Sequence, residues 1–205
     1  MNSELRRDLT AEEGPLAGAV ITDVSPVGSG CIHQAWKLCL GDGQVLFAKS
    51  GGASALPLFE VEAEALEALH AQADASFLVV PQPIALAALP HGAVLLLPWL
   101  DCGGNDQTAL GRGLALLHQS SMASSPALFG WHRDGFIGAG PQPGGWRDDW
   151  GSAFVELRLR PQLEALGGLQ QDSTHLNPLL LRLAEHLNEH QPVSYTHLRA
   201  HETNQ

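Results

Sequence analysis

Basic residues are scarce in this 205-residue chain, and the scarcity excludes one class of partner. Eleven lysines and arginines stand against 22 aspartates and glutamates, so the formal net charge is −11. Lys37 and Lys49 are the only two lysines. Proteins that bind nucleic acid neutralise its phosphates with clustered basic side chains. We therefore expect no nucleic acid as a main partner.

Long apolar runs and paired cysteines are also missing. No segment reaches the roughly 18 consecutive apolar residues that a membrane span requires, and the N-terminal stretch MNSELRRDLTAEEGP lacks the apolar core of a signal peptide. The three cysteines form no CxxC pair and are too few for a disulfide framework. These absences predict a cytoplasmic protein with reduced thiols and no membrane partner.

Residues 1–100 have the pattern of an antiparallel sheet lobe with one helix. Three short runs of apolar and β-branched residues, AVITDVSPV, AWKLCLG and QVLFAKS, are separated by GSG and GDG turns. Two more predicted strands, PQPIALAAL and GAVLLLPWL, follow a predicted helix from about Leu58 to Gln72. The tight turns between the runs favour antiparallel pairing.

Residues 101–192 have helical periodicity instead. The segments QTALGRGLALLHQSS, WRDDWGSAFVELRLRPQLEAL and NPLLLRLAEHLNEH repeat apolar residues at helical spacing. A Gly- and Pro-rich stretch from Phe129 to Gly145 is predicted to be a loop between the first two. The fold class is therefore α+β, with a sheet lobe followed by a helical lobe.

One carboxylate of the first predicted helix stands among apolar residues. Phe59 and Leu66 fall on the same helix face as Glu62, which predicts that Glu62 points inward. A buried carboxylate needs a cation, and Lys49 ends the strand VLFAK. We predict a Lys49–Glu62 ion pair. The alternative is a slightly rotated helix that brings Glu62 to the solvent.

A glycine-rich turn precedes this pair. Gly28, Ser29 and Gly30 lie in VGSGCI, between the first two predicted strands. Backbone N–H groups in such a turn can approach phosphates without obstruction, although most turns of this kind are simple hairpins. Followed by a strand lysine and an inward glutamate, the turn predicts a nucleotide-phosphate site. Cys31 in the same turn is either an oxidisable thiol or an inert, half-buried one.

In this order the motifs resemble those of the fructosamine kinase (ketosamine 3-kinase) family, which has a protein-kinase-like fold. The matching stretches are PVGSGCIHQAWKL, LFAK, FEVEAEALEAL, VPQPI, LLLPWL, LGRGLALLH, and FG with FIGAGPQPGGWRDDWGSAFVELRLRPQLEALG. The resemblance implies a kinase that uses ATP and Mg²⁺ to phosphorylate the sugar of ketosamines, either small molecules or glycated proteins. This phosphorylation initiates removal of the sugar.

The resemblance also implies roles for individual residues. Gly28, Ser29 and Gly30 would cover the phosphates, and Lys49, held by Glu62, would contact them. LLLPWL would be the hinge at about residues 95–100, with adenine bound by the carbonyl of Pro98 and the amide of Leu100. Proline stands where the family usually has an acidic residue, and it keeps the carbonyl while lacking the N–H.

The C-terminal part of the chain departs from the family pattern. The family's catalytic loop reads approximately HGDLWxGN and precedes a second metal-binding aspartate, and neither motif occurs in the sequence. VSYTHLRAHET, at residues 193–203, instead resembles one reading frame of a transposase adapter used in DNA sequencing libraries. We expect an inactive, aggregation-prone fragment in which residues 193–205 are a non-native tail.

Two other functions are compatible with the sequence. If the absence of the catalytic loop is natural, the chain is a non-catalytic, nucleotide-binding pseudokinase. If the tail is genuine, its two His-x3-His spacings favour a metal-binding protein, because helical spacing of this kind presents both imidazoles on one face. The histidines concerned are His186, His190, His197 and His201.

Overall fold

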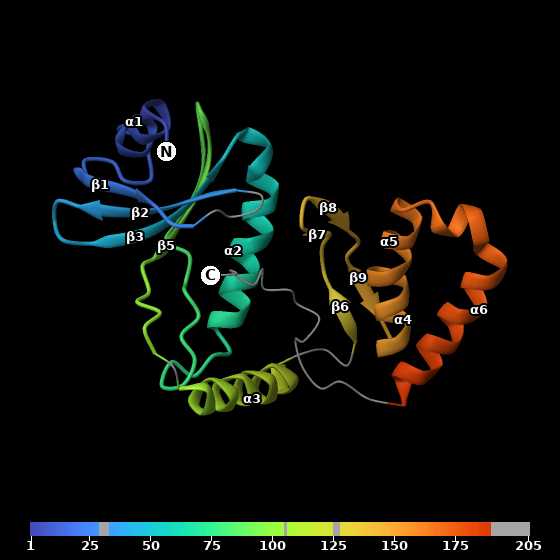
Figure 1. Cartoon of the computed structure of the whole chain (residues 1–205). Coiled ribbons are helices and arrows are strands. Elements are labelled where there is room, and N and C mark those ends of the chain that lie inside the picture. The colour runs from blue at the N-terminus through green and yellow to red at the C-terminus, as the bar shows by residue number, and fades with distance from the viewer. Residues whose placement is uncertain (29–32, 105, 125–127, 190–205) are drawn as a thin grey trace. The chain divides into compact units, whose positions relative to one another are not determined.

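The chain divides into two compact units, of which the first ends at Leu117 and the second begins at His118. The computed structural model describes residues 1–28, 33–104, 106–124 and 128–189 (Figure 1), so the predicted tail, 193–205, lies outside it. The division falls within helix α3 (Gln107–Ser124) rather than at residue 100. Gly113 explains this difference, because a Cβ there would lie 2.6 Å from the Cβ of Leu78. The first half of α3 therefore packs closely on the first unit.

A five-stranded antiparallel sheet forms the centre of the first unit, as predicted. The strand order is β1-β2-β3-β5-β4, so β5 is inserted between β3 and β4. Helix α2 (Leu56–His70) joins β3 to β4 and corresponds to the predicted helix. The strands are β1 (Ile21–Pro26), β2 (Gln34–Leu40), β3 (Val45–Gly51), β4 (Ala85–Leu89) and β5 (Gly92–Pro98).

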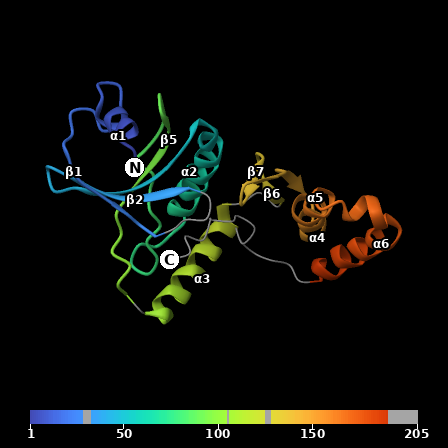
Figure 2. The same ribbon diagram turned by 45° about the horizontal axis from the view of Figure 1, so that its top comes forward.

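Each face of this sheet carries its own apolar core, because successive side chains of a strand point to opposite faces. On one face, Leu46 and Ala48 of β3 pack in a cluster that includes Leu9. On the other face, Phe47 packs against a cluster that includes Phe59 of α2. Figure 2 shows α1 and α2 beside the strands. Lys49 shares the α2 face with Phe47, and this alternation directs it toward Glu62.

The prediction of a single helix in the first unit was wrong, because α1 (Ser3–Thr10) precedes the sheet. The side chain of Asn2 caps this helix by accepting a hydrogen bond from Leu5 N at 2.7 Å. Leu5 and Leu9, four residues apart, are both buried. An Asn cap followed by this spacing was a readable helix signal. A short 3₁₀ turn, Ala53–Ala55, also leads into α2.

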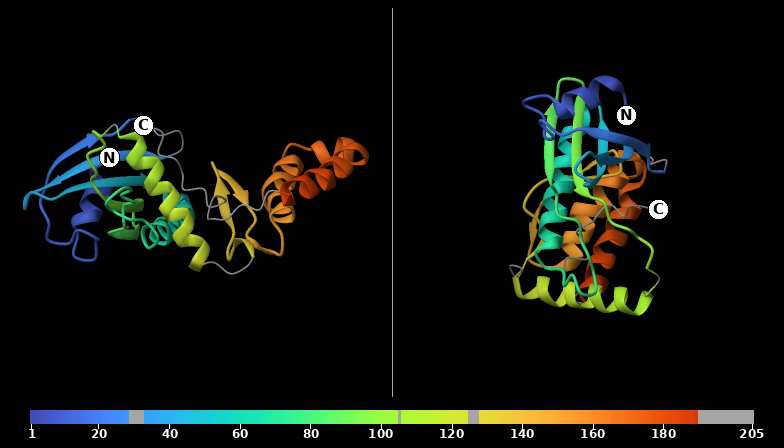
Figure 3. Two further views of the ribbon diagram at one scale, coloured as in Figure 1. Left: turned by 90° about the horizontal axis from the view of Figure 1, so that it is seen from below. Right: turned by 90° about the vertical axis from the view of Figure 1, so that its left-hand side faces the viewer.

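Two small hairpin-like pairs occupy the region predicted as a loop over residues 129–145, so that prediction was wrong. β6 pairs with β9 and β7 pairs with β8, both antiparallel. Gly130, with φ of +137°, allows the first pairing, because a Cβ there would lie 2.0 Å from Gly145 O. Figure 3 shows these pairs beside the helices of the second unit. The strands are β6 (Phe129–Trp131), β7 (Gly135–Ile137), β8 (Gly140–Gln142) and β9 (Gly145–Arg147).

The remaining helices of the second unit follow the prediction. α4 (Trp150–Phe154), a π-helical turn (Val155–Leu159) and α5 (Arg160–Ala165) form a continuous stretch, and α6 (Gly168–Asn188) follows with a kink at Asp172. Among helices in the described parts of the chain, none is long and apolar enough to span a membrane.

A polar clamp joins the start of α4 to the end of α6. Asp149 caps α4 by accepting from Ser152 N at 2.8 Å, and this hydrogen bond lowers the pKa of the Asp149 carboxyl. Asn188 accepts from Gly151 N at 2.6 Å and donates to Asp149 at 2.8 Å. Gly151 also lies so close to Ala184 that a Cβ would be 2.0 Å from the Ala184 carbonyl oxygen. The two helices are therefore in backbone contact.

Candidate functional site

The predicted ion pair between β3 and α2 is present. Lys49 Nζ lies 2.5 Å from Glu62 Oε1, and the two side chains are 14% and 11% exposed. The alternative of a rotated helix with a solvated Glu62 was therefore wrong. Because water has little access to the pair, the attraction between the ammonium and the carboxylate is screened less than it would be at the surface. The pair fixes an ammonium group at one place on the α2 face of the sheet.

The register of the sheet determines where this ammonium stands. Lys49 pairs with Ala35 of β2 on one side and with Leu95 of β5 on the other. It therefore lies in a central strand, where ladder hydrogen bonds on both sides hold the backbone. Phe59, which is fully buried, anchors α2 against the same face one helical turn before Glu62. Both partners of the ion pair thus come from rigid elements.

The glycine-rich turn is only partly described. Gly28 has φ of +58°, a conformation that favours glycine, and a Cβ at this position would meet nothing within 4 Å. The backbone conformation rather than crowding therefore explains this glycine. Ser29, Gly30 and Cys31 lie outside the described residues, so their predicted roles stay predictions.

Pro98 stands at the end of β5 without disturbing the sheet. Trp99 N donates to Val45 O at 3.3 Å. Because residues of an antiparallel strand bond alternately to the neighbouring strand, Pro98, the residue before Trp99, makes no hydrogen bond to β3. Two residues earlier, Leu96 O accepts from Ile84 N at 2.8 Å on the opposite side of β5. Because backbone groups alternate along a strand, the Pro98 carbonyl also points away from β3. A proline is tolerated here since its missing N–H is not needed for the β3–β5 ladder.

Leu100, the second predicted hinge residue, follows β5 and is half-buried. Its carbonyl accepts from Cys102 Sγ at 3.6 Å. This contact does not involve the amide, so the contact of the amide with adenine stays a prediction. The roles of Pro98 and Leu100 in adenine binding both remain predictions at this point.

A second lysine on the same sheet face was missed by the sequence reasoning. Lys37 pairs with Phe47 across β2 and β3, and residues paired across strands share a face. Its Nζ lies 4.5 Å from the ring centre of Trp99, and Trp99 Nε1 donates to Asp101 at 2.9 Å. The alternation of AWKL could have placed Lys37 on the face of Lys49 once the hairpin register was known. The two lysines of the chain therefore lie on one face, with different partners.

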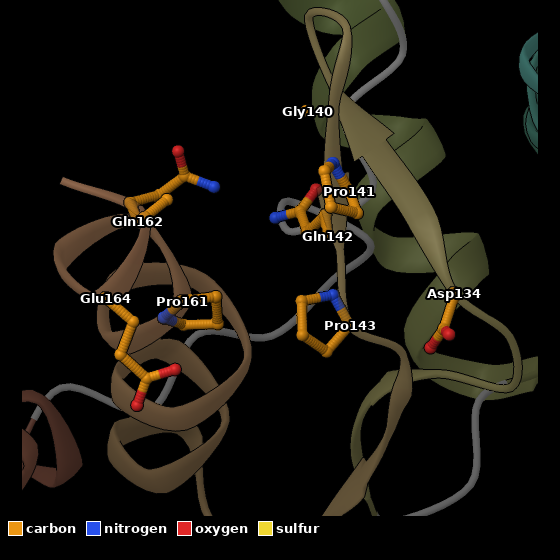
Figure 4. Close-up of a pocket in the computed structure, with 9 residues that line it drawn as sticks. Asp134, Gly140, Pro141, Gln142, Pro143, Pro161, Gln162 and Glu164 are labelled. Atoms are coloured by element: carbon orange, nitrogen blue, oxygen red, sulfur yellow. The ribbon is translucent and has the colours of Figure 1, made fainter. Parts of the chain in front are cut away.

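The second unit contains a cavity of about 240 Å³ between the β7–β8 pair and α5 (Figure 4). Asp134 and Glu164 lie on opposite sides of it, and the Asp134 carboxylate accepts from Gly144 N at 2.8 Å. Beside it, Arg158 donates to Pro143 O at 3.0 Å, and burial lowers the pKa of this guanidinium. None of the sequence-predicted site residues lies here. The cavity is also lined by Gly140, Pro141, Gln142, Pro161, Gln162 and Ala165.

The described residues give no support to a histidine metal site. Within residues 1–28, 33–104, 106–124 and 128–189, no three His, Cys, Asp or Glu side chains converge as metal ligands. His186 Nδ1 lies 3.4 Å from Glu189 Oε2 on α6. His190, His197 and His201 lie outside the described parts of the chain.

Comparisons with known proteins find relatives named as ketoamine and ribulosamine kinases. The chain is 41% identical over 141 residues to a protein of Synechocystis sp. named "Probable ketoamine kinase", covering 67% of this chain and 45% of that protein. It is 35% identical over 149 residues to the chloroplastic protein-ribulosamine 3-kinase of Oryza sativa subsp. japonica, covering 71% and 42%. The chain thus spans less than half the length of these curated relatives.

A solved structure shares the fold. The crystal structure of "Putative fructosamine-3-kinase" from Haemophilus somnus matches with a TM-score of 0.73 at 22% identity, covering 94% of this chain and 65% of that one. This likeness confirms the protein-kinase-like α+β fold that the resemblance implied. The family model described as fructosamine kinase matches residues 4–197. By this match, which covers nearly the whole chain, the protein belongs to the fructosamine kinase family.

Proposed function

We propose that this chain supplies the ATP-binding part of a kinase that phosphorylates ketosamines, including those on glycated proteins. The observation that carries the proposal is the Lys49–Glu62 pair, which presents an oriented ammonium on the face of a central strand. Relatives named as ketoamine and ribulosamine kinases support the choice of substrate class. We also propose a cytoplasmic location, because the sequence has only three cysteines and no CxxC pair.

Three described residues of the site suit different parts of ATP, and a fourth, Glu62, supports one of them. Lys49 would neutralise phosphate charge, and Glu62 would keep its ammonium in place. Gly28 adopts a backbone conformation that suits a turn near phosphates. The Pro98 carbonyl, directed away from β3, would accept a hydrogen bond from the adenine amino group. These residues bind and orient the nucleotide, and none of them is placed to deprotonate a sugar hydroxyl.

Mg²⁺ is less well served by the described residues. The ion prefers carboxylate oxygens together with substrate phosphates, and no carboxylate cluster of three ligands occurs in the parts of the chain that the structure describes. These residues therefore do not fit a magnesium site. Phosphoryl transfer also requires a base that aligns the attacking hydroxyl, so the function proposed for these residues is nucleotide binding.

A non-catalytic nucleotide-binding function is the second candidate. It is favoured by one sequence observation, the absence of any HGD or GDLW motif from the 205 residues. Release of ADP that depends on an added fructosamine, such as fructoselysine, separates the two functions. Turnover by the chain would support the kinase, whereas ATP binding without turnover would support the non-catalytic protein.

The two lysines give a matched test of nucleotide binding. We expect Lys49→Met to weaken ATP binding by at least tenfold in isothermal titration calorimetry, because a charge-assisted contact is worth about 1.5–3 kcal/mol. Lys37→Met removes the same charge from the same sheet face, and we expect less than a twofold change. Equal ATP affinity of Lys49→Met and the wild type would overturn the assignment.

A further inference from the structure

His33 stands where β2, the end of β3 and the start of α2 meet. It directly precedes Gln34, which pairs with Ser50, so the antiparallel register places His33 opposite Gly51. Its imidazole packs on Phe59 of α2 with ring centres 4.8 Å apart and planes tilted by 59°. This tilted arrangement is a favourable aromatic contact. The ring therefore bridges the sheet and the helix.

His33 is half-buried, and space around its ring is limited on the sides of Gly51 and Phe59. A Cβ added to Gly51 would lie 3.2 Å from His33 Cδ2 and 2.6 Å from the Cβ of Ala55. Phe59 has no exposed surface, so the helix side of the contact is fixed by the apolar core. The imidazole thus fills the gap between the last residue of β3 and the first turn of α2. A smaller side chain would leave an unfilled space at this junction.

Lys49 and Glu62 both belong to the elements that His33 contacts, within three residues of its contacts Gly51 and Phe59. Glu62 is three residues after Phe59 on α2, so the two side chains share a side of the helix. Lys49 is two residues before Gly51 on β3 and pairs with Ala35, two residues after His33. A shift of α2 away from the ring would therefore carry the Glu62 carboxylate away from the ammonium.

From this junction we infer that His33 is a positioning residue for the Lys49–Glu62 pair. Its ring sets the spacing between the first turn of α2 and the end of β3, and that spacing holds the carboxylate against the ammonium. The effect on ATP rests on the proposed function. The effect on the ion pair itself rests on the geometry alone, so the two can be tested separately.

Lysine acylation followed by mass spectrometry tests the positioning role without nucleotide. The chain has only two lysines, so Lys37 serves as the internal reference for Lys49. We expect the Lys49 to Lys37 labelling ratio to rise at least threefold in His33→Ala and in Glu62→Gln. The double variant should show no further rise, because both changes release the same ammonium. His33→Phe, which keeps a ring on Phe59, should stay within twofold of the wild type.

Two results would overturn the role of His33. One is an unchanged labelling ratio in His33→Ala. The other is an additive rise in the double variant, which would mean that His33 does not act through Glu62. If Lys37 itself is labelled faster in His33→Ala, the rise in the ratio reflects loss of the fold. His33→Leu, which keeps the bulk but not the ring, then replaces it: a threefold rise with unchanged labelling of Lys37 supports the role, and an unchanged ratio overturns it. His175→Ala, a change of an exposed histidine in the second unit, is the control.

The nucleotide readout separates this role from general stability. We expect His33→Ala to weaken ATP binding about tenfold and adenosine binding less than twofold, since Lys49 faces phosphates and not the nucleoside. Equal losses for both ligands would contradict a role through the ion pair. If the wild type binds no ATP, the proposed function fails, while the labelling ratios still decide the positioning role.

Discussion

Replacing Glu62 by glutamine should destabilise the first unit and leave a lysine ammonium without its counter-charge. Both side chains of the pair are nearly buried, at 14% exposure for Lys49 and 11% for Glu62. Removing one partner of a fully buried pair costs about 3–5 kcal/mol. The remaining exposure lets water solvate part of the charge, so we expect a loss of about 2–3 kcal/mol in the free energy of unfolding.

The double variant Lys49→Met with Glu62→Leu provides the sharper test. Apolar side chains of similar size can replace a buried ion pair at little cost, because the desolvation of both charges is removed together. We therefore expect the double variant to be more stable than Glu62→Gln and within about 1 kcal/mol of the wild type. ATP binding should nevertheless be weakened at least tenfold, as in Lys49→Met, because the ammonium assigned to the phosphates is gone and Lys37 lies over the Trp99 ring instead.

Urea unfolding followed by tryptophan fluorescence measures these differences. Trp36 and Trp99 report on the unfolding of the first unit. Because the chain has two compact units, the unfolding transition of the first unit is fitted separately from that of the second. Lys37→Met is the matched control, since it removes a charge that stacks on Trp99 instead of forming an ion pair. A double variant less stable than Glu62→Gln would refute the reasoning, as would a Glu62→Gln variant as stable as the wild type.

Three further changes test other parts of the fold. Gly151→Ala places a Cβ 2.0 Å from the Ala184 carbonyl oxygen, and we expect calorimetry to show the second unit destabilised by about 1–3 kcal/mol. Asp149 has a lowered pKa in the fold, so its stabilisation is complete above the unfolded value and is lost as the pH falls below about 4; acid unfolding curves should be less steep for Asp149→Asn. Asn2→Ala removes the cap of α1, and hydrogen exchange should show that helix weakened by about 1 kcal/mol.

The ion pair was predictable because two independent periodicities converge on it. Alternation along VLFAK put Lys49 on the face of Phe47, and helical spacing put Glu62 beside Phe59. The scarcity of lysine then left few possible partners. Strand positions were predictable for a similar reason, since glycine turns interrupt short apolar runs. These features depend on local pattern, which a sequence records directly.

Other features depend on contacts that local pattern does not record. The β6–β9 pairing requires Gly130 to meet Gly145, and the unit boundary depends on Gly113 fitting against Leu78. Glycine-rich sequence usually signals a loop, so close backbone packing was misread as irregular structure. The contact of His33 with Phe59 likewise joins segments 26 residues apart in sequence. Such contacts become visible only when the register of the sheet is known.

The separation of two apolar cores by one sheet has a practical consequence for engineering. Leu9, Leu46 and Ala48 pack on the face opposite α2, while Lys49 and Glu62 lie on the α2 face. Substitutions that improve packing in the core between α1 and the sheet can therefore raise the melting temperature of the first unit without changing the residues on the α2 face. A variant stabilised on the α1 side would tolerate strongly destabilising site mutations, so that proteins carrying such mutations can still be purified and measured.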